Sequence, residues 1–162
     1  AAAWNKYRLQ LLEGLGENGE IPPAWLGYYA GTCFRTACAL FGCIKTREEN
    51  PMEKDHSREE GYEYLERSFE FFPKWNNIAD GEELEVGNPL IYGGVRVVKG
   101  KGILKLPDGT YEPISYKDIF HDNINLPYYG LTATRGWEWF NSVRNEERFK
   151  EYVERARELQ PG

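Results

Sequence analysis

The chain has 162 residues, a net charge of −6 at neutral pH and an aromatic content of 15%. This length suits one ordinary domain, which can bury a core without disulfide or metal staples. Its 26 acidic residues outnumber its 20 basic ones, and the sequence contains no block of consecutive Lys and Arg residues. Nucleic acid would meet a repulsive field, so a nucleic-acid partner is not expected.

Residues 1–23 are expected to form a short helix followed by a loop. The stretch 4–13 has the amphipathic pattern of a helix, and Gly14 ends it. A pair of prolines, Pro22 and Pro23, then stands where the first turn of a following helix favours proline.

The only long apolar run of the sequence covers residues 24–44. At about 1.5 Å per residue, about twenty residues suffice to cross the hydrocarbon core of a bilayer. Trp25 and Tyr28 lie at its N-terminal end, where a membrane–water interface favours aromatic residues, and Lys45 follows its C-terminal end. The sequence therefore predicts a membrane-embedded helix over 24–44 and a polar, partner-docking region over 45–162.

Small residues on this helix offer places where a neighbouring helix can approach closely. Gly27 and Gly31 form a G-x-x-x-G pair, and Gly42 continues the small-residue spacing. Arg35 lies mid-span, where a charge costs about 3 kcal/mol on insertion scales, so it requires an oxygen ligand from a neighbouring helix or a cofactor. The residues predicted to pack on partners are Trp25, Gly27, Tyr28, Gly31, Arg35 and Gly42.

The same run also fits a buried core helix of a soluble, α-rich interaction module. Phe34, Cys38 and Phe41 would then supply one packing face, and Arg35 would mark an exposed edge. Because the run is apolar on nearly every face, such a helix needs cover from other elements all round. The sequence leaves both interpretations open, and dependence on detergent would separate them.

Beyond the apolar run, the sequence predicts an α-rich region with long irregular segments. Residues 45–61 are charged and are expected to form a solvated connector. A capping box, Ser57 with Glu60, begins a helix that Pro73 is expected to stop. A final amphipathic helix is expected from residue 137 towards the C-terminus.

One small β element is expected within this region. Residues 95–98 and 103–106 alternate in polarity around a Gly-rich turn, which predicts a two-stranded hairpin. Two strands alone are marginally stable in water, so the hairpin must lean on another surface. The predicted fold is therefore mainly α, with a small β-hairpin, long irregular segments and one embedded helix.

The three cysteines, Cys33, Cys38 and Cys43, are spaced five residues apart. Five helical steps of about 100° turn each side chain by about 140° from the previous one. The thiols therefore cannot share a metal ion or pair within one helix, where neighbours on a face are three or four residues apart. No metal site is expected, and small apolar filler is the main interpretation of these residues.

An enzymatic alternative depends on Cys33, which follows a Gly-Thr pair. The order resembles that of papain-like cysteine peptidases, in which a helix N-terminus activates a nucleophilic Cys. The resemblance implies His121 as the general base and Asp122 or Asn123 as the group that orients it. The alternative function is thus a cysteine hydrolase.

The combined pattern favours a non-catalytic accessory subunit of a larger membrane protein complex. A chain that begins with small residues and no Met is expected to have lost a targeting peptide. This favours a location in an organelle membrane, either the thylakoid membrane or the mitochondrial inner membrane. The expected partners are other protein subunits and the lipid membrane, and the sequence identifies no cofactor. Aromatic residues and Arg in coil segments are typical of protein interfaces.

Overall fold

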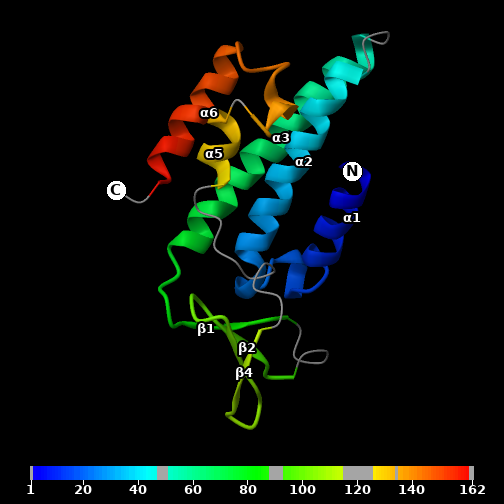
Figure 1. Cartoon of the computed structure of the whole chain (residues 1–162). Coiled ribbons are helices and arrows are strands. Elements are labelled where there is room, and N and C mark those ends of the chain that lie inside the picture. The colour runs from blue at the N-terminus through cyan, green and yellow to red at the C-terminus, as the bar shows by residue number, and fades with distance from the viewer. Residues whose placement is uncertain (1, 47–50, 88–92, 115–125, 134, 161–162) are drawn as a thin grey trace.

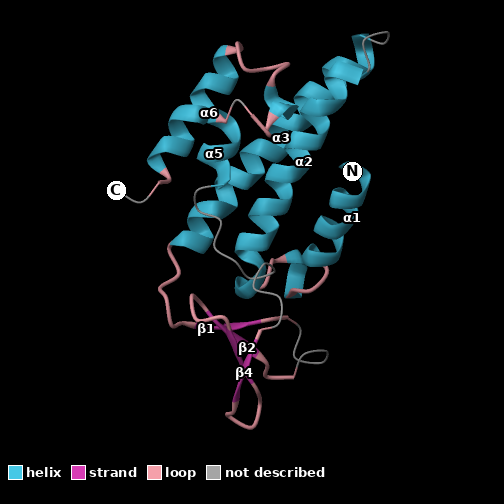
Figure 2. Ribbon diagram, in the orientation of Figure 1, coloured by secondary structure: helices cyan, strands magenta, loops and turns pink. Residues whose placement is uncertain are grey.

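The computed structural model describes residues 2–46, 51–87, 93–114, 126–133 and 135–160. They form a helical body with a small antiparallel sheet at one end, as Figure 1 and Figure 2 show. The helices are α1 (Ala2–Glu13), α2 (Leu26–Thr46), α3 (Pro51–Asn76), α5 (Leu126–Thr132) and α6 (Glu147–Glu158), with short 3₁₀ segments η1 (Glu17–Gly19), η2 (Pro23–Trp25) and η3 (Glu138–Phe140). The strands are β1 (Glu83–Glu85), β2 (Arg96–Val98), β3 (Ile103–Lys105) and β4 (Tyr111–Pro113).

Helix α2 is the central element of the helical body. It runs antiparallel to α3, while α1 packs on another side and η3 on a further one (Figure 1). Its side chains Phe34 and Phe41 join a core shared with α3, η3 and α6, whereas Tyr29 and Cys33 join a second cluster with α1. Helix α2 is apolar on nearly every face because elements of the same chain cover most of it.

The prediction of a membrane-embedded helix over 24–44 is wrong. In the described part of the chain, every helix is either too short or too polar to traverse a bilayer. Polar residues lower the apolarity of α2, and two of them are satisfied inside the helix. The Thr32 and Thr36 hydroxyls donate to the carbonyl oxygens of Tyr28 and Thr32, at 2.8 and 2.7 Å. The apolar residues of this run therefore serve the interior of the helical body.

Two glycines allow α2 and α3 to pack closely. A Cβ atom added to Gly61 of α3 would lie 2.8 Å from the ring of Phe41 on α2. Towards the other end of the pair, a Cβ atom on Gly27 of α2 would lie 3.0 Å from the Trp75 indole of α3. Each glycine is thus the surface on which a buried aromatic ring rests, so both contacts depend on the missing side chain.

Helix α6 is attached to α3 by an ion pair and by ring contacts. The Arg155 guanidinium donates to both carboxylate oxygens of Glu66, and the Tyr152 hydroxyl donates to the same carboxylate. The bonds from Arg155 and from the hydroxyl hold the pKa of Glu66 below its usual value. The Phe69 ring of α3 lies 5.4 Å from that of Tyr152, so polar and apolar contacts reinforce each other.

The four strands form an antiparallel meander in the order β1-β2-β3-β4. Leu84, Val97 and Leu104 stand opposite one another on successive strands. They pack with Trp75, near the C-terminal end of α3. The apolar face of the sheet therefore rests on the end of the helix pair, as a small sheet requires for stability.

Buried Lys99 joins the sheet to α3. Its ammonium group donates to the carbonyl oxygen of Trp75, 2.8 Å away, and to that of Ile78. These carbonyls lie at the C-terminal end of α3, where a helix leaves carbonyl groups without helical partners and its dipole favours a cation. The Lys99 Nζ atom also lies 4.9 Å from the centre of the Trp75 ring.

More residues lie in helices and strands than the sequence predicts. The hairpin expected at 95–98 and 103–106 corresponds to β2 and β3, but β1 and β4 extend it to a four-stranded sheet. The connector expected at 45–61 is helical in its described residues, and α3 continues past Pro73. The final helix begins later than expected, because η3 and turns occupy residues 138–146.

Replacing Gly61 with Ala should destabilise the fold, because the added methyl group overlaps the Phe41 ring. Overpacking costs about 1–3 kcal/mol in the free energy of unfolding, and the helix propensity of Ala offsets about 1 kcal/mol of this. Gly31→Ala on α2 is the matched control, because its Cβ would meet the Arg35 guanidinium at an ordinary 3.8 Å. Denaturant unfolding should place the midpoint of Gly61→Ala below that of Gly31→Ala, and the reverse order would contradict the packing argument.

Replacing Lys99 with Met should leave two carbonyl groups at the end of α3 without their cation. Hydrogen bonds to charged groups contribute about 1.5–3 kcal/mol, so we expect a loss of that order in the free energy of unfolding. Lys101→Met, at an exposed position of the same turn, should change stability by less than about 0.5 kcal/mol. Equal stability of the two variants, measured by denaturant unfolding, would show that Lys99 does not join the sheet to α3.

Candidate partner-docking site

A groove runs along α2, between the start of α1 and the segment around η3. It consists of two adjoining hollows of about 610 and 620 Å³, which share Gly42, Gly136 and Trp139. We call the whole feature the Trp139 groove. The Lys54 hollow is lined by Phe41, Gly42, Ile44, Lys54, Gly136, Glu138, Trp139, Asn141 and Ser142. The Arg35 hollow is lined by Ala2, Asn5, Arg35, Cys38, Ala39, Gly42, Cys43, Gly136, Trp137 and Trp139.

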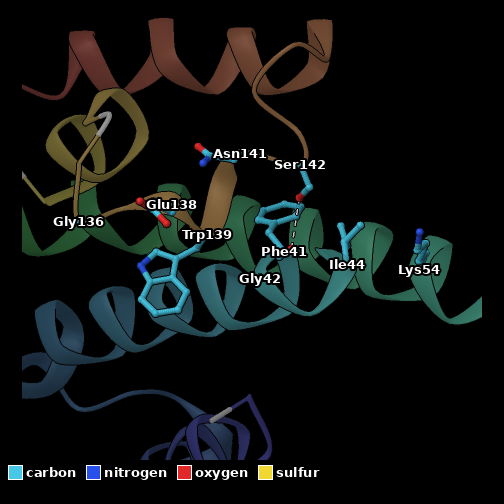
Figure 3. A pocket seen from close by; sticks show the side chains of 9 residues that line it. All are labelled: Phe41, Gly42, Ile44, Lys54, Gly136, Glu138, Trp139, Asn141 and Ser142. Carbon is cyan, nitrogen blue, oxygen red and sulfur yellow. Dashed lines mark hydrogen bonds between the residues drawn. The ribbon is translucent and has the colours of Figure 1, made fainter. Parts of the chain in front are cut away.

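Trp139 forms a wall of both hollows. Figure 3 shows its side chain lying over α2 near Gly42, with Lys54 further along the groove. A Cβ atom on Gly42 would lie 3.4 Å from the Trp139 ring, so the indole rests on this glycine. The Trp139 residue nevertheless remains 50% exposed. The indole therefore offers apolar surface to anything that enters the groove.

Arg35 is the one charged residue among the described residues that line its hollow. It is exposed, and within the described ranges no hydrogen bond or ion pair engages its guanidinium. Its neighbours in the hollow include Cys38, Ala39 and Trp137, which are small or apolar. A guanidinium beside apolar walls can bind a carboxylate through two parallel hydrogen bonds, which is the chemistry this hollow offers.

Arg144 holds the rim that carries Trp137 and Trp139. Its guanidinium donates to the carbonyl oxygens of Leu131, Ala133 and Trp137, the last two at 2.7 and 2.8 Å. These carbonyls belong to the end of α5 and to the approach to η3. One side chain therefore ties together the two segments that form this side of the groove.

Helix α1 has a second apolar face in addition to the one that packs on α2. Leu9 and Leu12 are buried in the cluster with α2, whereas Trp4, Tyr7 and Leu11 are 58%, 50% and 54% exposed. At about 100° per residue, the three exposed residues fall within about 60° of one another and roughly 140° from the buried pair. We call Trp4, Tyr7 and Leu11 the α1 apolar face.

The residues that sequence analysis assigned to partner packing divide into two groups. Arg35 and Gly42 line the Trp139 groove, where they are available to a partner. The remaining four lie near the start of α2, where they contribute to contacts within the chain.

These four residues are part of the junction between the helices and the sheet, or of the interior of α2. The Trp25 indole donates to the Val86 carbonyl oxygen, and its ring packs edge-on against Tyr28. Gly27 is buried beneath an aromatic ring of α3, and Gly31 is buried within α2. Contacts within the chain thus account for Trp25, Gly27 and Tyr28, whereas the position of Gly31 has room for a methyl group.

Cys33 lacks the setting of a catalytic nucleophile. It lies well inside α2 rather than at a helix N-terminus, and its side chain is fully buried against α1. Burial raises the pKa of its thiol to about 12, so the thiol is protonated at neutral pH. The other residues of the enzymatic alternative, His121 with Asp122 or Asn123, lie outside the described residues.

Comparisons with protein-family models, curated proteins and solved structures found no match to this chain. The residues that the structure describes also contain no cluster of His, Cys, Asp and Glu that could hold a metal ion.

Sequence reasoning missed the residues that give the groove its shape. Trp139 lies in η3, within a segment that was expected to belong to the final helix. A position in a helix does not indicate that the Trp139 side chain packs on α2. Trp4 and Tyr7 lie in α1, for which the amphipathic pattern predicted a helix but not a second, exposed apolar face. The available signal was the presence of large apolar residues on both faces of α1.

Thiol labelling tests the assignment of the cysteines. Burial raises the pKa of the Cys38 thiol to about 12 as well, whereas Cys43 is only partly buried and lines the groove. In the native chain, iodoacetamide should label Cys43 first and Cys33 last, and all three should react quickly in denaturant. Mass spectrometry of peptides from a time course gives the order, and preferential labelling of native Cys33 would favour the enzymatic alternative.

Proposed function

We propose that this chain is a non-catalytic accessory subunit that docks on another protein of a larger assembly. The observation that carries the proposal is the α1 apolar face, where Trp4, Tyr7 and Leu11 are at least half exposed. Single exposed apolar residues are ordinary, but three large ones on one helix face are typical of an interaction surface.

The arrangement of α1 supports a second partner for this helix. A helix that is apolar on one stripe packs on its own core, and a helix with apolar residues on two opposed faces is expected to be covered on both. In α1 the first face is covered by α2, through Leu9 and Leu12. The α1 apolar face would be covered by another protein, since Trp and Tyr supply much of the binding energy in protein interfaces.

The rings of this face contact each other within the chain. The Trp4 and Tyr7 rings stack with 5.8 Å between their centres, and the Arg8 guanidinium lies 5.3 Å from the Trp4 ring. Side chains held by one another lose less conformational entropy on binding than free ones. The face therefore has the composition of a docking surface, and two of its rings already support each other.

The proposal does not require a helix embedded in a membrane. The apolar run that suggested one is covered by α1, α3 and η3. An organellar membrane setting for the assembly stays a prediction from the sequence. The buried Cys33 thiol gives no support to a hydrolase, so the accessory role is preferred over the enzymatic alternative.

Truncating the α1 apolar face should release the chain from its assembly without unfolding it. The variant Trp4→Ala with Leu11→Ala removes two exposed side chains, and loss of one interface hot spot already weakens binding by about thirtyfold. The measurement is the fraction of chain in a complex of fixed stoichiometry, determined by native mass spectrometry of material purified from its source.

Tyr111→Ala on β4 is the matched control, because Tyr111 is a similarly exposed aromatic residue on the sheet. It should leave the complex intact, and both variants should keep the thermal melting profile of the native chain. Recovery of the native chain as a free monomer at its natural level would contradict the accessory role. So would an intact complex formed by a folded α1 variant.

A further inference from the structure

We propose that the Trp139 groove binds an amphipathic helix of the partner protein, with an Asp or Glu of that helix paired to Arg35. This inference rests on the proposed accessory function and names the chemistry of the segment that the groove accepts.

The floor of the Arg35 hollow suits close approach by another helix. It is formed by Cys38, Ala39, Gly42 and Cys43, whose side chains are small and share one side of α2. From Arg35 to Cys43 the helix rises about 12 Å, which is about two helical turns. Small side chains over two turns leave a shallow channel into which the ridge of a second helix can pack.

The walls of the hollow supply apolar contacts on both sides of this channel. Trp137 and Trp139 form one wall, and Ala2 and Asn5 at the start of α1 form the other. Arg144 holds the backbone that carries this tryptophan wall, through its hydrogen bond to the Trp137 carbonyl oxygen. A braced aromatic wall is the kind of surface on which interface hot spots are found.

Charge decides which helix fits. Among the described lining residues of its hollow, Arg35 alone is charged, and it is positive in a chain whose net charge is −6. An occupant that covered Arg35 without an acidic group would leave a guanidinium desolvated and unpaired, which is strongly unfavourable. An occupant with a carboxylate at this end satisfies the cation and gains the specificity that complementary charges provide.

The extent of the groove favours a protein segment over a small amphiphile. A fatty carboxylate could fill the Arg35 hollow, with its head group on Arg35 and its chain along the floor. On the other side of Trp139, however, the adjoining Lys54 hollow offers Lys54 and Glu138 as further polar sites. An occupant that uses both hollows must be longer than one of them and must carry polar groups along its length, as an amphipathic helix does.

Peptide selection on the full chain tests the proposal. A display library of helix-forming peptides is selected on the native chain and on Arg35→Glu. Peptides enriched on the native chain should carry Asp or Glu beside an apolar face, and those enriched on Arg35→Glu should carry Lys or Arg instead. Fluorescence anisotropy with one enriched peptide should show about tenfold weaker binding when Arg35 is replaced by Gln, or when the acidic residue of the peptide is replaced by its amide, with no further loss when both changes are combined.

Two control variants separate the pairing from general effects. Arg157→Gln removes a charge from α6, away from the groove, and should bind the peptide like the native chain. Trp139→Ala should weaken binding while it keeps the preference for an acidic peptide. Enriched peptides without an acidic preference, displacement of the peptide by dodecanoate at an equal concentration, or no saturable peptide binding would each overturn the proposal.

The native assembly distinguishes failure of this inference from failure of the accessory role. If the complex loses the Trp4→Ala, Leu11→Ala variant but retains Arg35→Gln at full occupancy, the accessory role stands and the pairing with Arg35 is wrong. If the native chain has no stable partner, the accessory role fails. Loss of Arg35→Gln from the complex, with rescue by Arg35→Lys, would support both.

Discussion

The packing of α2 on α3 is the contact on which the rest of the structure depends. The Phe41 ring rests on Gly61, and the Trp75 ring rests on Gly27, so the two helices meet at glycines towards both ends of the pair. Several of the described elements attach to this pair: α1 to one side of α2, η3 to another, α6 to α3, and the sheet to the end at Trp75. A change in the distance between α2 and α3 would therefore alter each of these contacts, because packed interiors transmit strain.

Part of the fold follows directly from the sequence. The periodicity of α1, the apolar run of α2 and the turn between β2 and β3 each carry a local signal, and the structure has these elements close to the expected residues. The cover of α2 could not be predicted, because hydropathy measures how apolar a segment is and not what lies against it. The start of α3 was missed since its first turns are charged and lack an apolar stripe, and β1 and β4 are three-residue strands with little pattern.

The candidate docking site shows the same division. Arg35 and Gly42 were found from the sequence because a charge and a small residue stand out inside an apolar run. Trp139 could not be connected to them, since its position on Gly42 results from the turn that η3 makes and not from any local periodicity. Lys99 was hidden for a related reason: it lies in a Gly-rich turn, and only the folded chain brings it to the end of α3.

The three hydrogen bonds of Arg144 have a consequence for how the groove would be used. In the described part of the rim, one guanidinium already holds the backbone of α5 and of the approach to η3, so these segments have little to rearrange when a partner arrives. Association with a preformed surface is limited by diffusion and orientation, whereas a surface that must first rearrange adds a slower step. Differences in affinity among partners of such a rim would arise mainly in how long each complex lasts, and little in how fast it forms.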